Sequence, residues 1–212
     1  MTRRNLIQSL TAGLKTLTGE EPDPARVDKL LSYLDLLIQW NEAYNLTAVR
    51  DPSEMVSRHL LDSLSVMPWV RSGHLLDAGA GAGLPGVPLA IMRPGITVTL
   101  LDSTGKKIRF LRHVMRQLEL VNVRAVQARL ESWQTNEMPA CIISRAFSSL
   151  STFVSASRHL AGPDTRFLAM KGKIPDDELE GLPAWLRVDS VEKLVVPGLQ
   201  EDRHLVIMSP NT

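Results

Sequence analysis

The sequence predicts an α/β protein with five parallel strands, a C-terminal antiparallel pair and an N-terminal helical extension. Short apolar runs recur at regular intervals after Gly73, and helix-like segments separate the first five of them. The last two runs have no obvious helix between them. Strands that alternate with helices form a parallel sheet with right-handed crossovers, whereas a short connection joins antiparallel neighbours. We therefore expect a helical extension over residues 1–70, packed on an α/β domain over residues 71–212, as one structural unit.

The helical extension is expected to contain two helices, each with one apolar face. In the first, apolar residues recur at steps of three and four, as on one buried side of a helix. They are Val27, Leu30, Leu31, Leu34, Leu37 and Ile38. Pro22 and Pro24 precede them, where a helix can begin, and this helix should end near Trp40 and Asn41. The second helix is expected from Ser53 to about Pro68.

The elements of the α/β domain follow from the same alternation. We expect strands at residues 75–78, 98–101, 121–126, 141–144, 167–170, 191–196 and 204–208. We expect helices at residues 87–92, 106–120 and 149–160, with a turn near 130–133. Pro197 and Gly198, followed by the acidic Glu201 and Asp202, predict a hairpin between the last two strands.

The composition is that of an ordinary globular protein. Of the 212 residues, 44% are apolar and 22% are charged, which argues against disordered, collagen-like and coiled-coil chains. The 24 Lys and Arg residues nearly balance the 23 Asp and Glu residues, unlike the charge of a strongly basic nucleic-acid coat protein. The charges are nevertheless uneven: residues 103–129 contain seven bases and one acid, and residues 172–202 contain eight acids and three bases.

The location of the protein is predicted from features that the sequence lacks. Cys141 is the one cysteine and cannot form an internal disulfide, which fits a reducing compartment. There is no uninterrupted run of 18 apolar residues, so no segment is expected to span a membrane. Polar residues also interrupt the N-terminal apolar run too early for a secretory signal. We therefore expect a cytoplasmic protein.

The run LLDAGAGAGLPG at residues 75–86 carries the strongest functional signal. A short strand passes into three alternating glycines, Gly79, Gly81 and Gly83, and a helix is expected just after Pro85. Glycine allows backbone conformations that other residues avoid and leaves room for a ligand. At the carboxyl end of the first strand of an open sheet, such a loop is the expected cofactor site. The alternative is a tight strand-to-helix turn, which needs fewer glycines.

The choice of cofactor depends on the glycine spacing and on Asp102. The spacing is not the G-x-G-x-x-G pattern that brings a pyrophosphate to a helix N-terminus. Asp102 ends the next expected strand, where a carboxylate can accept hydrogen bonds from both hydroxyls of a ribose. This combination favours S-adenosyl-L-methionine over NAD. Asp102 could instead cap the helix that follows it.

Several sequence motifs, spread over nearly the whole chain, add to the signal of the glycine loop. They are WNEAYNLTAV at 40–49, RHLLDSL at 58–64, GAGAGLPG at 79–86, LLDS with GKK at 100–107, ISRAF at 143–147 and RHLV at 203–206. In this order and combination they resemble the RsmG family, formerly called glucose-inhibited division protein B. Its members are bacterial 16S ribosomal RNA guanine-N7 methyltransferases. Ala80 and Ala82 depart from the family, in which Thr, Ser or Pro often occupies these positions.

The resemblance implies a Rossmann-like class I methyltransferase fold with S-adenosyl-L-methionine as the methyl donor. It also implies 16S rRNA as the substrate, within an assembled or nearly assembled 30S subunit, and no obligate protein partner. It places cofactor contacts on Gly79, Leu84, Leu130, Glu131 and Arg145, with Leu130 and Glu131 framing the adenine. From the residues alone, Leu130 would be an ordinary core leucine. Arg145 could bind the cofactor or position the target base.

The reaction that the resemblance implies needs no general base. Guanine N7 has an exposed lone pair and no proton, so an in-line displacement can be catalysed mostly by holding donor and acceptor in position. The sequence lacks the Asn/Asp-Pro-Pro-aromatic motif that exocyclic-amine methyltransferases usually have. Cys141 begins an apolar strand and is expected in the core rather than as a nucleophile. No His, Cys or acidic cluster has metal-ligand spacing.

The basic residues that follow Asp102 are the expected RNA-binding surface. On a helical wheel Arg109, Arg112 and Arg116 share one face, from which they could neutralise RNA phosphates. The alternative is a solvated charged face without a ligand. Further candidate RNA-binding residues are Lys106, Lys107, Arg58 and Lys171.

Three other functions remain open from the sequence. A methyltransferase of the same fold could act on a small molecule in a pocket closed by the helical extension. An NAD-dependent oxidoreductase is disfavoured by the glycine spacing. A ribosome-assembly factor that binds without catalysis is disfavoured by the intact glycine loop and by Asp102.

Overall fold

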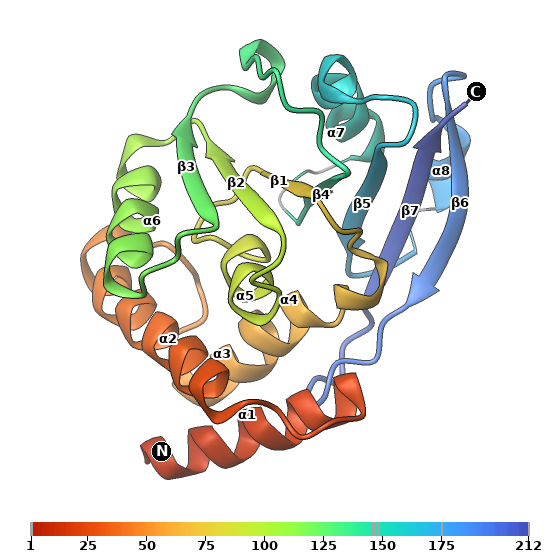
Figure 1. Ribbon diagram of the computed structural model, residues 1–212. Helices are drawn as coiled ribbons and strands as arrows, with labels where there is room; N and C mark the ends of the chain where they lie inside the picture. Colours follow the sequence, from red (N-terminus) through yellow and green to blue (C-terminus); the bar gives the residue numbers. More distant parts are fainter. Residues whose placement is uncertain (1, 146, 148, 175, 212) are drawn as a thin grey trace.

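The computed structural model describes residues 2–145, 147, 149–174 and 176–211, and the strands of this part of the chain form one sheet. Their order in space is β3-β2-β1-β4-β5-β7-β6 (Figure 1). The strands are β1 (His74–Ala78), β2 (Thr97–Asp102), β3 (Val123–Gln127), β4 (Cys141–Ser144), β5 (Arg166–Lys171), β6 (Leu186–Lys193) and β7 (His204–Pro210). Strands β1 to β5 are parallel, and β7 is antiparallel to both β5 and β6. The predicted five parallel strands with a C-terminal antiparallel pair are therefore confirmed.

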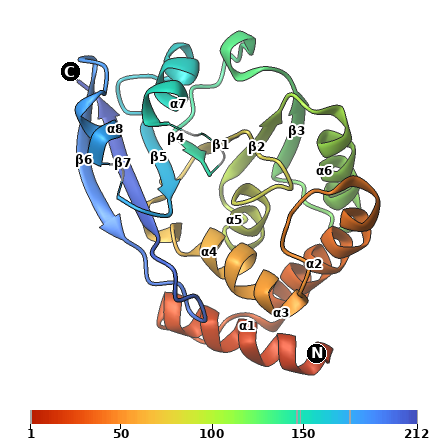
Figure 2. The ribbon, with the colours of Figure 1, turned by 180° about the vertical axis from the view of Figure 1, so that it is seen from behind.

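Helices cover both faces of this sheet (Figures 1 and 2). The α-helices are α1 (Arg3–Thr18), α2 (Pro24–Tyr44), α3 (Pro52–Met55), α4 (Asp62–Leu64), α5 (Gly86–Met92), α6 (Gly105–Gln117), α7 (Leu150–Ser157) and α8 (Asp176–Glu180). One apolar cluster joins α1, α2, α5 and α6 to one face, and a second joins α7 to the other face. Because successive strand residues point to opposite faces, Leu100 belongs to the first cluster and Leu101 to the second.

The helical extension shares its core with the sheet. The first apolar cluster contains Leu10 of α1, Leu34 of α2 and Leu100 of β2, and all three are fully buried. Helix α2 begins as predicted, with the Asp23 carboxylate accepting a hydrogen bond from the backbone N–H of Ala25 at 2.9 Å. It continues a few residues beyond the predicted end, to Tyr44. Helix α1 was not among the predicted elements.

The second predicted helix, over residues 53–68, is interrupted. It consists of α3, a π-helix η1 (Val56–Leu61), α4 and a 3₁₀ turn η2 (Met67–Trp69). The Asp51 carboxylate starts α3 by accepting from the backbone N–H of Ser53 at 2.7 Å. A π-helical turn holds an extra residue per turn and shifts the side chains beyond it, and such turns are frequent at functional sites. Here it contains Arg58 and His59.

Two predicted strands are misplaced in sequence. Strand β6 spans Leu186–Lys193 rather than 191–196, because its charged residues occur on an edge strand that is half exposed. Strand β3 begins at Val123 rather than 121, and Val121 is 99% exposed in the turn before it. The predicted turn near 130–133 is a 3₁₀ helix η3 (Leu130–Ser132), and the segment at 149–160 is α7 followed by η4 (Arg158–Leu160). Helix α8 was not predicted.

The helices of the described chain do not include a membrane-spanning one. None of them is both long enough and apolar enough to cross a bilayer.

Candidate functional site

The glycine loop between β1 and α5 has the backbone that its sequence predicts. Gly79, Gly81 and Gly83 have φ angles of 74°, 59° and 92°, in the left-handed region that favours glycine. Gly83 is also sterically required, because a Cβ there would lie 2.6 Å from Cγ2 of Val87 and 2.8 Å from Cδ2 of Leu111. Helix α5 begins at Gly86, just after Pro85 as expected.

Side chains from three elements hold the glycine loop in place. At its start, the backbone N–H of Gly81 donates to Oδ2 of Asp102 at 3.0 Å. In its middle, the Tyr33 hydroxyl of α2 donates to the carbonyl oxygen of Ala82 at 2.8 Å. At its end, the backbone N–H of Gly86 donates to Oδ2 of Asp77 at 2.8 Å. The helical extension therefore takes part directly in shaping the loop.

Asp77 is a buried carboxyl directly beneath this loop. It is 1% exposed, and its Oδ1 has no hydrogen-bond partner among the described residues. Burial disfavours the charged form and raises the pKa of Asp77 to about 7, although the hydrogen bond from Gly86 acts in the opposite direction. The nearby Arg145 also lowers this pKa. Asp77 therefore titrates near neutral pH.

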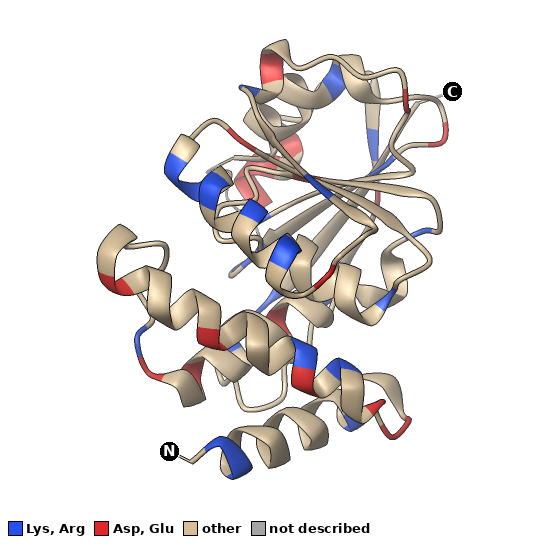
Figure 3. Ribbon diagram, turned by 60° about the vertical axis from the view of Figure 1, so that its left-hand side comes forward, with Lys and Arg blue, Asp and Glu red and all other residues tan. Residues whose placement is uncertain are grey.

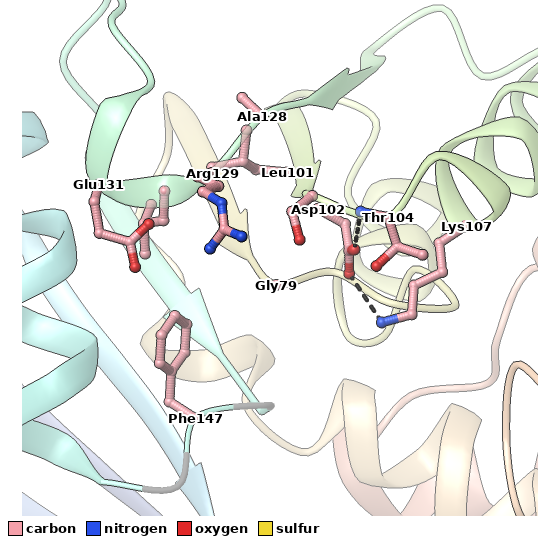
Figure 4. A pocket seen from close by; sticks show the side chains of 11 residues that line it. Gly79, Leu101, Asp102, Thr104, Lys107, Ala128, Arg129, Glu131 and Phe147 are labelled. Atoms are coloured by element: carbon pink, nitrogen blue, oxygen red, sulfur yellow. Dashed lines mark hydrogen bonds and ion pairs between the residues drawn. The ribbon is translucent and has the colours of Figure 1, made fainter.

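A cavity of about 270 Å³ opens beside the glycine loop, and we call it the β1–β3 crevice (Figure 4). It brings together four residues that sequence reasoning assigned to the cofactor: Gly79, Asp102, Leu130 and Glu131. Sequence reasoning missed six other residues of its lining, which are Leu101, Ser103, Thr104, Ala128, Arg129 and Phe147. Phe147 lies in the ISRAF run, which offered a signal for it. Ala146 of that run lies outside the described residues.

Four predicted cofactor residues do not line the β1–β3 crevice. Gly81 and Gly83 shape the loop from behind, as described above. Leu84 is 4% exposed, and its side chain packs in the first apolar cluster. Arg145 is the fourth exception, because its side chain lines a different cavity. Contacts of these residues with a cofactor stay predictions.

The surroundings of Asp102 are compatible with both roles that the sequence left open, and its contact with a ribose stays a prediction. Its Oδ1 accepts from the backbone N–H of Thr104 at 2.8 Å, immediately before α6, as a residue that organises a helix start does. The carboxylate also lies in the crevice wall (Figure 4). Lys107, predicted to bind RNA, donates to Oδ2 of Asp102 at 3.2 Å and lines the crevice as well. A carboxylate has about four acceptor sites, so these contacts leave room for a ligand hydroxyl.

A second cavity, of about 360 Å³, lies at the carboxyl ends of β4 and β5, and we call it the arginine cavity. The predicted residues Arg58, Arg145 and Lys171 line it, together with Asp62 and Arg203, to which no role was assigned. Nη1 of Arg145 donates to Oδ2 of Asp62 at 3.2 Å, and Nε of Arg203 donates to Oδ1 of Asp62 at 3.1 Å. These residues come from distant parts of the chain, so no local motif could reveal the group.

His59 forms part of the wall of the arginine cavity. Its Nε2 is 2.9 Å from the Thr47 hydroxyl, which also accepts from the backbone N–H of Val49 at 3.2 Å. Burial, helped by the charge of Arg145, lowers the pKa of His59 to about 4. The imidazole is therefore neutral at neutral pH, which fits a structural residue better than a cation for RNA.

The predicted arginine stripe lies on α6, a helix with basic residues at intervals along its length (Figure 3). Arg109, Arg112 and Arg116 are exposed and flank a shallow groove with Trp40 and His113. Within the described chain, no hydrogen bond, ion pair or ring contact engages any of the three guanidinium groups. By contrast, Lys106 donates to the carbonyl oxygen of Tyr44 at 3.0 Å, and Lys171 donates to Glu178 at 2.9 Å. The stripe is therefore the part of the predicted RNA surface with cations free for a ligand.

Cys141 occupies the core position that its strand predicts. It is 1% exposed, and burial raises the pKa of its thiol. Its sulfur accepts a hydrogen bond from the backbone N–H of Arg71 at 3.2 Å. In the described residues, no cluster of three or more His, Cys, Asp or Glu side chains could hold a metal ion.

Solved structures with this fold include S-adenosylmethionine-dependent methyltransferases. The glycopeptide N-methyltransferase MtfA, solved in complex with S-adenosyl-L-methionine, matches with a TM-score of 0.62 and 12% identity, over 73% of this chain and 88% of that chain. A SAM-dependent methyltransferase from Aquifex aeolicus matches with a TM-score of 0.59 and 18% identity, over 78% of this chain and 97% of that chain. At these identities the likeness shows the fold alone, and it confirms the predicted Rossmann-like methyltransferase sheet.

Several proteins are far more similar to this chain in sequence than these solved structures are. A protein of Pseudomonas fluorescens (strain Pf0-1) named ribosomal RNA small subunit methyltransferase G is 53% identical over 201 residues, which cover 95% of this chain and 94% of the relative. A protein of the same name from Stutzerimonas stutzeri (strain A1501) is 59% identical over 181 residues, or 84% of each chain. The family model described as rRNA small subunit methyltransferase G matches residues 26–206. The chain therefore belongs to the GidB family of rRNA small subunit methyltransferases G.

Proposed function

We propose that this protein transfers a methyl group from S-adenosyl-L-methionine to N7 of a specific guanine in the 16S rRNA of the small ribosomal subunit. Membership of the GidB family supports a methyltransferase that depends on S-adenosyl-L-methionine and acts on rRNA. The observation that carries the proposal is the β1–β3 crevice, in which a glycine loop and a carboxylate meet at the ends of adjacent parallel strands. The choice of guanine N7 rests on the resemblance and on the chemistry of the site.

The residues of the crevice fit the adenosyl part of the methyl donor. Asp102 offers carboxylate oxygens for ribose hydroxyls, and Gly79 leaves the loop side of the crevice free of a side chain. Leu101, Leu130 and Phe147 supply apolar walls for a flat adenine ring. S-Adenosyl-L-methionine, when bound, supplies an electrophilic methyl group next to the glycine loop.

The described side chains can catalyse attack by a nitrogen lone pair mainly through positioning. Guanine N7 carries no proton, so no side chain has to remove one. Cys141 is buried in the core and is not placed to act as a nucleophile. Asp62, the carboxylate of the arginine cavity, is already hydrogen-bonded by Arg145 and Arg203. These features favour an in-line displacement without a general base, with Arg145 as the candidate for positioning the base.

RNA binding is proposed for two basic surfaces, the arginine stripe of α6 and the arginine cavity, which contains Arg58 and Lys171. Helix α6 begins three residues after Asp102, and its unpaired arginines extend from there along the outside of the domain (Figure 3). Such cations attract RNA phosphates and make binding strongly dependent on salt. The proposed partner is 16S rRNA within the 30S subunit, in the cytoplasm. No membrane interaction is proposed.

The decisive experiment is methyl transfer to small subunits from a strain that lacks this enzyme. With labelled S-adenosyl-L-methionine, we expect about one methyl group per subunit, at one guanine. Chemical cleavage at N7-methylguanine followed by primer extension should map that position. Methylation at another atom would overturn the N7 assignment. Methylation of free nucleosides but not of subunits would favour a small-molecule methyltransferase instead.

A further inference from the structure

The Asp62 carboxylate joins two arginines that lie far apart in the sequence. Asp62 is 2% exposed, in α4 directly after the π-helix. It is hydrogen-bonded through Oδ2 to Arg145, in the segment after β4, and through Oδ1 to Arg203, just before β7. Arg145 also donates to the backbone carbonyl oxygen of Arg58 at 3.2 Å, and Arg203 donates to that of Asp202 at 2.9 Å. Two flexible side chains are thus held in fixed positions on one wall of the arginine cavity.

Both arginines keep donors available for a ligand. In the described residues, no hydrogen bond uses Nη2 of Arg145 or of Arg203. The side chains of these arginines are 28% and 22% exposed, so they are shielded from water without being sealed off. Asp62 is the single acidic residue among the described residues that line the cavity, against four basic ones. Arg58 is already paired with Glu54 and Glu201, and Lys171 with Glu178. The cations left to attract an anion are therefore Arg145 and Arg203, which share the one carboxylate of Asp62.

The reaction itself indicates which part of the RNA this anion is. Methylation at N7 leaves the guanine ring with a positive charge, which nearby arginines would oppose. A cationic cavity is therefore poorly suited to surround the reacting ring. A backbone phosphate has the opposite charge, and the planar guanidinium group matches its oxygens in a fork geometry. A phosphate in the arginine cavity would also lie near the carboxyl end of β4, beside the β1–β3 crevice.

We propose that the arginine cavity binds a backbone phosphate of the RNA next to the target guanine, and that Asp62 is a positioning residue that aims Arg145 and Arg203 at it. This inference rests on the proposed rRNA methyltransferase function. It assigns a role to two residues, Asp62 and Arg203, that have none in the reaction described so far. Arg145 would then position the target base through the phosphate next to it, and not by contact with the reacting ring. Holding the two guanidinium groups before RNA arrives lowers the cost of ordering them on binding.

The proposal makes an unusual prediction for Asp62→Asn. By charge alone, removing a carboxylate from a cationic cavity should strengthen the binding of RNA. If Asp62 positions the arginines, its loss should weaken binding instead, since both side chains become free to move. We expect the KM for small subunits to rise about tenfold, with kcat changed much less. The affinity for S-adenosylhomocysteine, measured by calorimetry, should stay unchanged.

Glu54→Gln is the matched control. Glu54 pairs with Arg58 at 3.5 Å but is 60% exposed and does not line the cavity. Its replacement should leave binding of small subunits equal or slightly tighter. Arg203→Gln should weaken binding and lower the slope of log affinity against log salt by about one, the value for one lost phosphate contact. Arg203→Lys keeps the charge and should restore the slope but only part of the affinity.

Every outcome of these experiments either supports or overturns the phosphate site and the positioning role of Asp62. Weaker binding by Asp62→Asn, with unchanged cofactor affinity, supports the proposal. Unchanged or tighter binding overturns the positioning role, and so does an equal loss of cofactor affinity, which would make Asp62 a residue of the fold. An unchanged salt slope in Arg203→Gln overturns the phosphate site. If the unmodified enzyme does not methylate small subunits, the proposed function fails rather than this inference.

Discussion

The β1–β3 crevice and the arginine cavity lie at the same edge of the sheet but are built in different ways. The crevice is shaped mainly by backbone: three glycines with positive φ, fixed by carboxylates at the ends of β1 and β2. The arginine cavity is shaped by long charged side chains around one buried acid. The first arrangement suits a ligand that needs close approach to the main chain. The second suits an anion that is recognised by its charge.

The two cavities also differ in how far their residues lie apart in the sequence. Gly79 and Asp102, at the core of the crevice, are separated by one βα unit. Arg58 and Arg203, which both line the arginine cavity, are separated by most of the chain. This difference predicts separable effects. Changes at the crevice should alter cofactor affinity, and changes at the basic surfaces should alter RNA affinity.

The largest expected effect is that of Gly83→Ala. The new methyl group would clash with Val87 and Leu111, and the alanine would have to keep the positive φ of Gly83. We expect the free energy of unfolding, measured in urea, to fall by about 2–4 kcal/mol. Calorimetry should show loss of S-adenosylhomocysteine binding, because the loop cannot keep its shape.

Gly19→Ala is the control for this experiment. Gly19 has a φ of 75° but no atom within 4 Å of the position of a Cβ. It should cost only about 1–2 kcal/mol of unfolding free energy and leave cofactor affinity intact. An equal cost for both substitutions would show that the loop is not closely packed at Gly83.

Asp102→Asn tests the ligand side of the crevice. The amide cannot accept as many hydrogen bonds as the carboxylate, so we expect the affinity for S-adenosylhomocysteine to fall about 10- to 100-fold. The affinity for small subunits in the absence of cofactor should not change. Asp28→Asn, at an exposed acid of α2 that pairs with Arg3, serves as the control and should have no effect. A loss of subunit binding in Asp102→Asn would contradict the separation of the two sites.

Reversing two charges of the stripe, Arg112→Glu with Arg116→Glu, tests the outer RNA surface. The slope of log affinity for small subunits against log salt should decrease by about two. Cofactor affinity should stay the same, since neither residue lines the crevice. Arg4→Glu changes an arginine of α1 that is also exposed, so it controls for net charge alone. An effect of Arg4→Glu as large as that of one stripe residue would remove the case for a specific surface.

The last prediction concerns how the free energy of unfolding depends on pH. Asp77, beneath the glycine loop, and His59, in the wall of the arginine cavity, should change it in opposite directions. The pKa of Asp77 is about 7, so between pH 4 and 7 the folded protein binds more protons than the unfolded chain. Its contribution to the free energy of unfolding therefore falls as the pH rises through this range. The pKa of His59 is about 4, below its ordinary value of 6.5, so its contribution rises from pH 4 to 6.5.

Urea unfolding between pH 4 and 8 should separate these two contributions. Asp77→Asn should remove the fall and His59→Gln the rise, each by about 1–3 kcal/mol. Identical pH profiles for both variants and the unmodified protein would show that neither group is buried as described.

The directions of the strands could be predicted from the sequence because apolar runs and helical segments alternate locally. The glycine loop could be predicted for the same reason, since its signal lies within twelve consecutive residues. Strand β6 was misplaced because its charged residues, such as Asp189 and Glu192, belong to an edge strand that does not read as an apolar run. The π-helix in the second helical segment packs against α1, where Gly13 lies next to Leu61, and a contact between residues so far apart leaves no local signal in the sequence.

The candidate site was predicted in part. Gly79, Asp102, Leu130 and Glu131 come together in the crevice, but Leu130 was found through the family resemblance and not through its own chemistry. Arg145 was predicted to bind the cofactor or to position the target base, which stays a prediction, and its side chain lines the arginine cavity, where it pairs with Asp62. That contact joins residues 83 positions apart, and nothing in either local sequence announces it.

The strand order has a consequence for biosynthesis. Strand β7 is made after β6 but lies between β5 and β6. Because a chain grows from its N-terminus, β6 has no place in the sheet until β7 has left the ribosome that makes it. Arg203 also emerges only then, immediately before β7. A nascent chain can thus assemble its glycine loop well before its second cavity, which cannot form until the segment that carries Arg203 and β7 has been made.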